Sequence, residues 1–151
     1  MDVKVKISTF CEVAPLFSRT AEYALRAVVC LAQNAHRPLT TQQVAVLTRV
    51  PQGYLSKVLQ LLTKSSLIQA YRGPHGGYRL SRPAERISIL EVLNAVDPIK
   101  RIIRCPLDLP DHGARLCPLH RRLDQAMDIV ERTLAETTLA QVLSEPAEST
   151  P

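Results

Sequence analysis

The residues from Val50 to Leu80 constrain the fold most, because a helical repeat there gives way directly to a glycine-rich turn. Pro51 suits the first residue of a helix, whose amide has no acceptor within the helix. Apolar residues then recur every three or four positions, at Leu55, Val58, Leu59 and Leu62. This spacing predicts a helix over residues 51–65 with one buried face. The turn sequence Arg72-Gly73-Pro74-His75-Gly76-Gly77 predicts a hairpin with short strands over 67–71 and 78–80.

The opposite face of this helix carries amides, a hydroxyl and ammonium groups, at Gln52, Ser56, Lys57, Gln60 and Lys64. An isolated amphipathic helix would simply present such a face to solvent. The local charge favours another interpretation, because no Asp or Glu lies between Glu22 and Glu85 while eight Arg and Lys residues do. The other 11 basic residues are outnumbered by the 14 acidic ones, so the positive charge is local. This distribution predicts a nucleic-acid-binding face.

Helix-capping residues place the neighbouring helices. Ser18 predicts the start of a helix that reaches about residue 35, and Thr40 with Gln43 predicts a short helix with Val44 and Leu47 turned inward. A turn over 48–50 then completes a helix-turn-helix whose second helix is the one over 51–65. Ser88 with Glu91 predicts a further helix, which Pro98 terminates.

Length and composition agree with one domain that carries an additional element. The chain has 151 residues, of which 46% are apolar. It has no run of the ~20 apolar residues that cross a membrane and no long apolar core of a signal peptide, so we expect a cytoplasmic protein without a membrane segment. Four cysteines in that compartment favour thiols or metal ligands over disulfides. Cys30 fits the helix core, and Cys11 is given no role.

Residues 18–28 (SRTAEYALRAV), 54–60 (YLSKVLQ) and 72–78 (RGPHGGY) together resemble the Rrf2 family of winged-helix transcription regulators. That family includes an iron–sulfur cluster regulator and a nitric-oxide-sensing repressor. The resemblance spans 16–143 and implies a mainly α fold with a small β-hairpin wing. We expect an N-terminal extension over 1–15, a winged helix-turn-helix DNA-binding domain over 16–97, a sensor loop over 98–117, a dimerisation helix with a short final helix over 118–143, and a tail over 144–151.

The resemblance implies that the start of the recognition helix enters the major groove and that the wing reaches the neighbouring minor groove of double-stranded DNA. By position, the DNA-binding residues are Gly53, Tyr54, Ser56, Lys57, Gln60, Arg72, Gly73, His75, Gly76 and Gly77. Lys57 can donate to guanine or to phosphate, and Tyr54 is equally suited to anchor the helix beside Val50. Arg72 is the strongest candidate, because a guanidinium in a narrow minor groove senses its negative potential.

The stretch over 104–120 is irregular in pattern and holds Cys105, Cys117 and His120. In cluster-binding members of the family a loop here holds three cysteines and an iron–sulfur cluster. This chain has Asp111, followed by His112, where the middle cysteine is expected. We rank an iron–sulfur cluster with mixed ligands first, thiol oxidation second and a Cys, Cys, His, His zinc site third. A loop that binds a small molecule or a partner without metal is a further alternative.

Pro118 predicts the start of a long helix to about residue 137, and Thr138 with Gln141 predicts a short one after it. Apolar residues recur at steps of four and three, at Leu119, Leu123, Ala126, Val130 and Leu134. This seam favours a homodimer over packing against the same chain. The hypothesis is therefore a homodimeric repressor that binds a palindromic operator. A metal or thiol enzyme and a protein-interaction module rank below it, because no nucleophile with a base is recognisable and the charge favours DNA.

Overall fold

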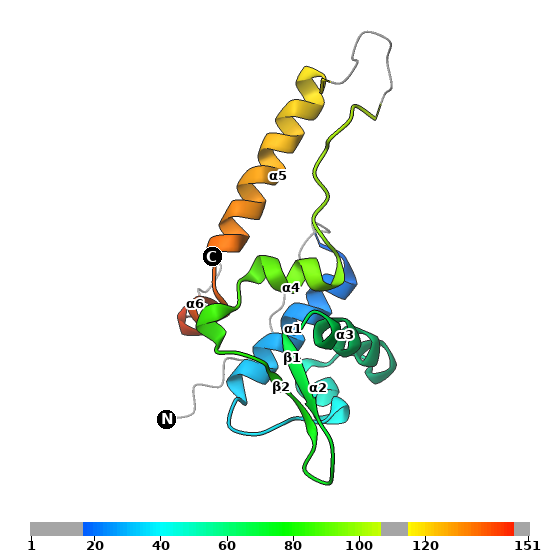
Figure 1. The fold of residues 1–151 in the computed structure, drawn as a ribbon, viewed down its shortest axis with the longest axis vertical. Coiled ribbons are helices and arrows are strands. Elements are labelled where there is room, and N and C mark those ends of the chain that lie inside the picture. The colour runs from blue at the N-terminus through cyan, green and yellow to red at the C-terminus, as the bar shows by residue number, and fades with distance from the viewer. Residues whose placement is uncertain (1–16, 107–114, 147–151) are drawn as a thin grey trace.

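The computed structural model describes residues 17–106 and 115–146, and Figure 1 shows their arrangement. The fold is mainly α-helical, with one antiparallel two-stranded hairpin and a long C-terminal helix, as predicted. Its elements are α1 (Arg19–Gln33), α2 (Thr41–Thr48), α3 (Gln52–Lys64), β1 (Ile68–Tyr71), β2 (Gly77–Leu80), the 3-10 helix η2 (Ala84–Arg86), α4 (Ile89–Val96), α5 (Pro118–Glu136) and α6 (Leu139–Ser144). Within the described residues, no helix is long and apolar enough to cross a membrane.

The predicted caps form. The Ser18 hydroxyl accepts the Ala21 amide at 3.2 Å, and reciprocal capping boxes open α2, α4 and α6. These bonds satisfy amides that have no acceptor within their own helix. The recognition helix is one residue shorter at each end than predicted. Pro51 is the N-cap with an extended ψ of 128°, so α3 begins at Gln52, and it ends at Lys64 with Ser65 as the C-cap.

The core lies where α1, α3 and α4 meet. Leu55, Val58, Leu59 and Leu62 of α3 are all fully buried, together with small residues of α1 such as Ala24 and Ala27. Cys30 belongs to this core, as predicted, and burial raises the pKa of its thiol to about 11.

Helix α2 turns toward the core differently from the prediction. Leu47 was expected to point inward, but its exposed fraction is 46%. The inward positions are Val44 and Thr48, four residues apart. Thr48 tolerates burial because its hydroxyl donates to the Val44 carbonyl at 2.7 Å, so the buried polar atom has a partner.

The hairpin is joined to the segment before α2 near its turn, through β2. Its register runs from Ile68 opposite Leu80 to Tyr71 opposite Gly77. Leu39 adds a bridge to Tyr78, whose amide donates to the Leu39 carbonyl at 2.7 Å. Gly77 has a φ of 147°, and a Cβ there would lie inside contact distance of the Leu39 carbonyl. Only glycine therefore fits this junction.

Helix α5 extends away from the other helices, and the segment over 97–106 runs beside it (Figure 1). Within the described chain, α5 has no fully buried residue. Leu134, near its C-terminal end, packs on the core. The chain then returns to the core through α6, where the Leu139 amide donates to the Ile87 carbonyl at 2.8 Å. The helix is thus anchored at one end.

Candidate DNA-binding face and metal site

The outer face of α3 presents most of the side chains predicted to contact DNA. Gly53, Lys57 and Gln60 are exposed, whereas the apolar side of the same helix is buried. Ser56 is half-buried, and its hydroxyl donates to the Gln52 carbonyl at 3.0 Å. That bond uses the hydroxyl hydrogen and leaves the oxygen as an acceptor.

Tyr54 is held against α1. Its ring meets Tyr23 edge to face, with ring centroids 5.3 Å apart and an interplanar angle of 81°. Its hydroxyl lies 2.6 Å from the Thr20 hydroxyl oxygen, at hydrogen-bond distance. The side chain is still 41% exposed. Tyr54 therefore anchors α3 on α1 and keeps part of its ring at the surface.

The wing carries the other predicted residues. Arg72, Gly73 and His75 are exposed at its tip, and Gly76 and Gly77 are half-buried. The Gly76 amide donates to the Gly73 carbonyl at 2.9 Å, which closes the turn. A Cβ at Gly76 would also meet the Tyr71 carbonyl inside contact distance. The glycines of the turn are therefore needed for the shape of the wing itself.

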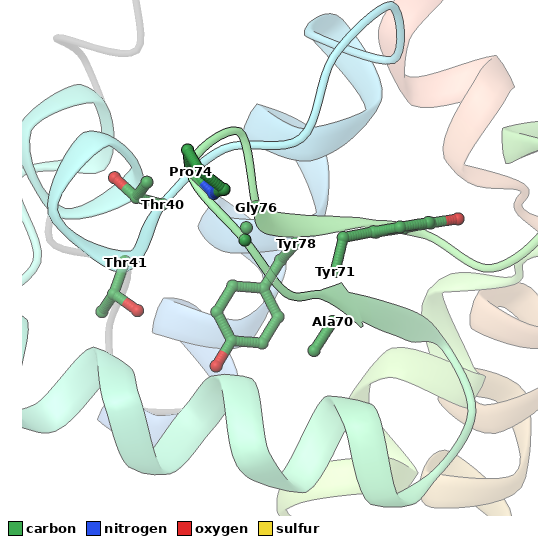
Figure 2. A pocket seen from close by; sticks show the side chains of 9 residues that line it. Thr40, Thr41, Ala70, Tyr71, Pro74, Gly76 and Tyr78 are labelled. Atoms are coloured by element: carbon green, nitrogen blue, oxygen red, sulfur yellow. The ribbon is translucent and has the colours of Figure 1, made fainter.

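An open pocket of about 320 Å³ lies where the wing meets the start of α2. Figure 2 shows Thr40 and Thr41 on one side of it and Tyr71 and Tyr78 on the other. Pro74 and Gly76 of the turn lie at its edge. The pocket is shallow, and its lining combines residues of the wing with Thr40 and Thr41 at the start of α2.

The basic residues of the acid-free stretch divide into two groups. Three make bonds within the fold: Arg26 pairs with Glu22, Arg79 donates to the Ala35 carbonyl at 2.6 Å, and Arg82 donates to Glu91 at 2.6 Å. The others are exposed, at Arg37, Arg49, Lys57, Lys64 and Arg72. The second group keeps five positive charges at the surface.

The predicted ligand residues Cys105, Cys117 and His120 come together. Their ligand atoms all lie within 4.8 Å of one another, so the three side chains form a group that can hold a metal ion. The Nδ1 atom of His120 lies 3.0 Å from the Cys117 sulfur and 3.6 Å from the Cys105 sulfur. Asp111 and His112, the other two predicted ligands, lie outside the described residues.

Local structure explains why Cys117 and His120 meet. Cys117 is the N-cap of α5, Pro118 begins the helix, and His120 follows within the first turn. The His120 backbone amide and then its ring lower the pKa of the Cys117 thiol to about 7, with a further contribution from Cys105. Amide groups at a helix N-terminus stabilise negative charge, and a thiolate is the form that binds metals.

Arg101 binds a cluster of three carboxylates on α5, and we call these four residues the Arg101 clamp. The clamp positions the segment that carries Cys105. The Arg101 guanidinium donates twice to Asp124 at 2.7 Å, to Asp128 at 2.7 Å and to Glu131 at 3.1 Å. The Ile102 amide also donates to Asp124 at 3.0 Å. These contacts raise the pKa of Arg101 and lower the pKa values of Asp124 and Asp128.

The Arg101 clamp was not predicted from the sequence. Its available signal was the spacing of Asp124, Asp128 and Glu131, which recur at steps of four and three and therefore share one face of a helix. The position of the arginine had no comparable signal. It lies 23 residues before Asp124 and 30 before Glu131, on a segment without regular structure.

Known proteins similar in sequence are transcriptional regulators. A family model for Rrf2, described as an iron-dependent transcriptional regulator, matches residues 17–145. A relative from Mycobacterium tuberculosis is 38% identical over 130 residues, which cover 83% of this chain and 79% of the relative. Another from Aquifex aeolicus is 24% identical over 132 residues, covering 85% of this chain and 92% of the relative. Both are named as HTH-type transcriptional regulators.

Solved structures share the fold. CymR of B. subtilis, described as the global cysteine regulator of that organism, superposes with a TM-score of 0.72 at 22% identity. The match covers 85% of this chain and 95% of CymR. IscR of T. potens gives a TM-score of 0.71 at 20% identity, over 88% of this chain and 93% of IscR.

Proposed function

This chain belongs to the Rrf2 family of helix-turn-helix transcriptional regulators, which are not enzymes, and we propose that it acts as a homodimeric repressor. In this proposal residues 16–97 bind DNA, residues 98–117 sense a signal and residues 118–143 form the dimer. The observation that carries the proposal is the contrast between the two faces of α3. Its apolar face is buried, while Gly53, Lys57 and Gln60 are exposed beside an exposed wing.

The proposed contacts divide by groove. Gly53, Lys57 and Gln60, with Tyr54 and the Ser56 oxygen, face the major groove, where amides and ammonium groups pair with base edges or phosphates. Arg72 and His75 approach the minor groove, and the three wing glycines allow the backbone to come close. The exposed arginines and lysines add contacts to phosphates, which raise affinity without reading sequence.

A dimer would place two such faces on one palindromic operator. Leu119, Leu123 and Ala126 of α5 are exposed in the single chain, with Val130 half-buried, and Ile129, which the sequence seam did not include, is 60% exposed. Leu134 serves the core of its own chain instead. An apolar stripe of this length suits the same helix of a second subunit. Two recognition helices then reach major grooves about 34–36 Å apart, or a multiple of that.

The proposed sensor is the Cys105, Cys117 and His120 group at the far end of α5. An iron–sulfur cluster ranked first here from the sequence alone, and the description of the family as iron-dependent supports a metal at these residues. A change at this group would move the segment over 97–106 relative to α5 and alter the separation of the two recognition helices. Thiol switching is the second candidate, favoured by the low pKa of Cys117 and its closeness to Cys105.

The test of DNA binding is a fluorescence anisotropy titration. The probe is a duplex selected from a random library by the purified protein, measured at two salt concentrations. We expect a steep loss of affinity with salt, with a slope of about −0.9 per neutralised phosphate. Arg72→Ala should weaken binding by about 1–3 kcal/mol, which is roughly fivefold to 150-fold.

Arg86→Ala is the matched control, because Arg86 is also exposed but lies in η2, which packs against α6. It removes the same charge away from α3 and the wing. Equal losses for the two variants would reduce the role of Arg72 to net charge. Binding that does not respond to salt would refute the proposed function.

A further inference from the structure

We propose that Cys105, Cys117 and His120 bind one divalent ion of the zinc(II) or iron(II) type with tetrahedral geometry, and that they do not span an iron–sulfur cluster. The inference deepens the proposed function, because it names the occupant of the sensor group. It concerns the ligand atoms alone and does not depend on what the protein does with DNA.

The distances between the ligand atoms carry the proposal. A zinc ion holds thiolates at about 2.3 Å and imidazole nitrogens at about 2.0–2.1 Å, so ligands at tetrahedral angles lie about 3.6–3.8 Å apart. The observed separation between His120 Nδ1 and the Cys105 sulfur is 3.6 Å. The separation to the Cys117 sulfur is 3.0 Å, and a shift of about 0.6 Å brings it into the same range. All three atoms lie within 4.8 Å of one another.

A cluster needs a different arrangement. In a four-iron cluster each thiolate binds a different iron, so the ligands surround the whole cube. In a two-iron cluster only two ligands share an iron, and a third must lie beyond the other iron. Three ligand atoms that all lie within 4.8 Å of one another are too close together to bind the different irons of a cluster. The described group therefore fits three corners of one tetrahedron.

The group is also assembled by contacts that do not involve a metal. Cys117 and His120 are placed by the first turn of α5, and Cys117 is 8% exposed. Cys105 lies four residues after Arg101, on the segment that the Arg101 clamp holds against α5. Ligands held in this way lose little freedom when an ion binds, which favours binding. Two thiolates and an imidazole bind zinc(II) or iron(II) in preference to magnesium or calcium, which favour oxygen ligands.

The experiment measures metal content and ligand geometry on the full chain purified without oxygen. Elemental analysis with an assay for acid-labile sulfide should give about one zinc or iron per chain and no sulfide. Cobalt(II) added to the metal-free chain should then produce the intense visible bands of a tetrahedral thiolate site. Zinc in place of iron, or iron in place of zinc, decides the ion within the proposal.

Variants assign the ligands. Cys105→Ser and His120→Ala should each reduce cobalt affinity at least tenfold and weaken the visible bands, while circular dichroism verifies the helices. Cys30→Ala is the matched control, because it removes a thiol that lies in the α1 core, and it should leave the spectrum unchanged. If one ligand variant fails to fold, the other still reports.

Two results would overturn the proposal. Two or four irons per chain with stoichiometric sulfide would establish a cluster, and a chain that binds none of zinc, iron and cobalt at micromolar concentration would leave the group without an ion. The anisotropy titration is separate from both. A chain that binds one ion but not DNA would refute the proposed function and keep the metal site.

Discussion

Replacing Gly53 by alanine should move stability and DNA affinity in opposite directions. Gly53 is the second residue of α3, is exposed, and would have no heavy atom within 4 Å of an added Cβ. The substitution therefore costs no packing and reduces the freedom of the unfolded chain. Such a change stabilises a protein by about 0.4–1 kcal/mol. For a chain of this size we expect the melting temperature to rise by about 1–4 °C.

The effect on DNA follows from where the new methyl group would lie. If the start of α3 lies against base edges, glycine allows the backbone to approach closely, and the methyl group occupies that space. We expect affinity for the selected operator to fall about tenfold, or about 1.4 kcal/mol. Differential scanning calorimetry and the anisotropy titration measure the two quantities on the same preparation.

The control is Gln125→Ala, at an exposed position in the middle of α5. It also raises helix propensity, by a few tenths of a kcal/mol, and should leave operator affinity unchanged. A Gly53→Ala chain that gains stability and binds the operator as tightly as the original would show that Gly53 does not lie at the DNA surface. The assignment of the major-groove residues would then be wrong at its first member.

Three further substitutions test the remaining features. Leu123→Glu places a charge in the exposed stripe of α5 and should convert the dimer to a monomer in sedimentation velocity, whereas the control Gln125→Glu should not. An unmodified chain that sediments as a monomer would contradict the proposed dimer. Gly77→Ala should lower the free energy of unfolding in urea by about 2 kcal/mol or more, because its Cβ meets the Leu39 carbonyl, whereas Gly73→Ala, with open space around the Cβ, should lower it by about 1 kcal/mol. Equal losses would mean that the positive φ of each residue, and not the contact with Leu39, sets the cost. Arg101→Ala should weaken cobalt binding about tenfold, whereas the control Arg132→Ala, which removes a salt bridge to Asp128 alone, should not. Equal effects of the two variants on cobalt affinity would exclude a positioning role for Arg101.

The fold could be predicted largely because its signals are local. A capping box needs only four consecutive residues, and all three predicted boxes form. The apolar spacing of α3 likewise predicted its buried face. The prediction for Leu47 was wrong because the face of a short helix that points inward depends on where the neighbouring helices lie. Thr48, whose hydroxyl has an acceptor in its own helix, occupies the inward position instead.

The site could be predicted in part. Cys105, Cys117 and His120 were selected by residue type and spacing, and the structure brings them together. The partners of Tyr54 lie 31 and 34 residues earlier in the chain, on α1, so no local pattern could reveal that it braces two helices. The Arg101 clamp was missed for the same reason, since it joins the first part of the sensor loop to a helix at least 23 residues later in the chain.

The one-ended attachment of α5 has a mechanical consequence. Helix α4 is held at its N-terminal end by the strand-like pairing of Ser88 with Thr138, and it continues at Asp97 into the segment clamped by Arg101. The group of Cys105, Cys117 and His120 therefore lies where two segments, 97–106 and α5, come together far from the core, and these segments lead to opposite ends of the same short helix. If the segment over 97–106 slides along α5, the two ends of α4 are displaced differently and α4 rotates. Helix α4 packs against both α1 and α3. A displacement at the proposed sensor group would thus reach the recognition helix as a torque.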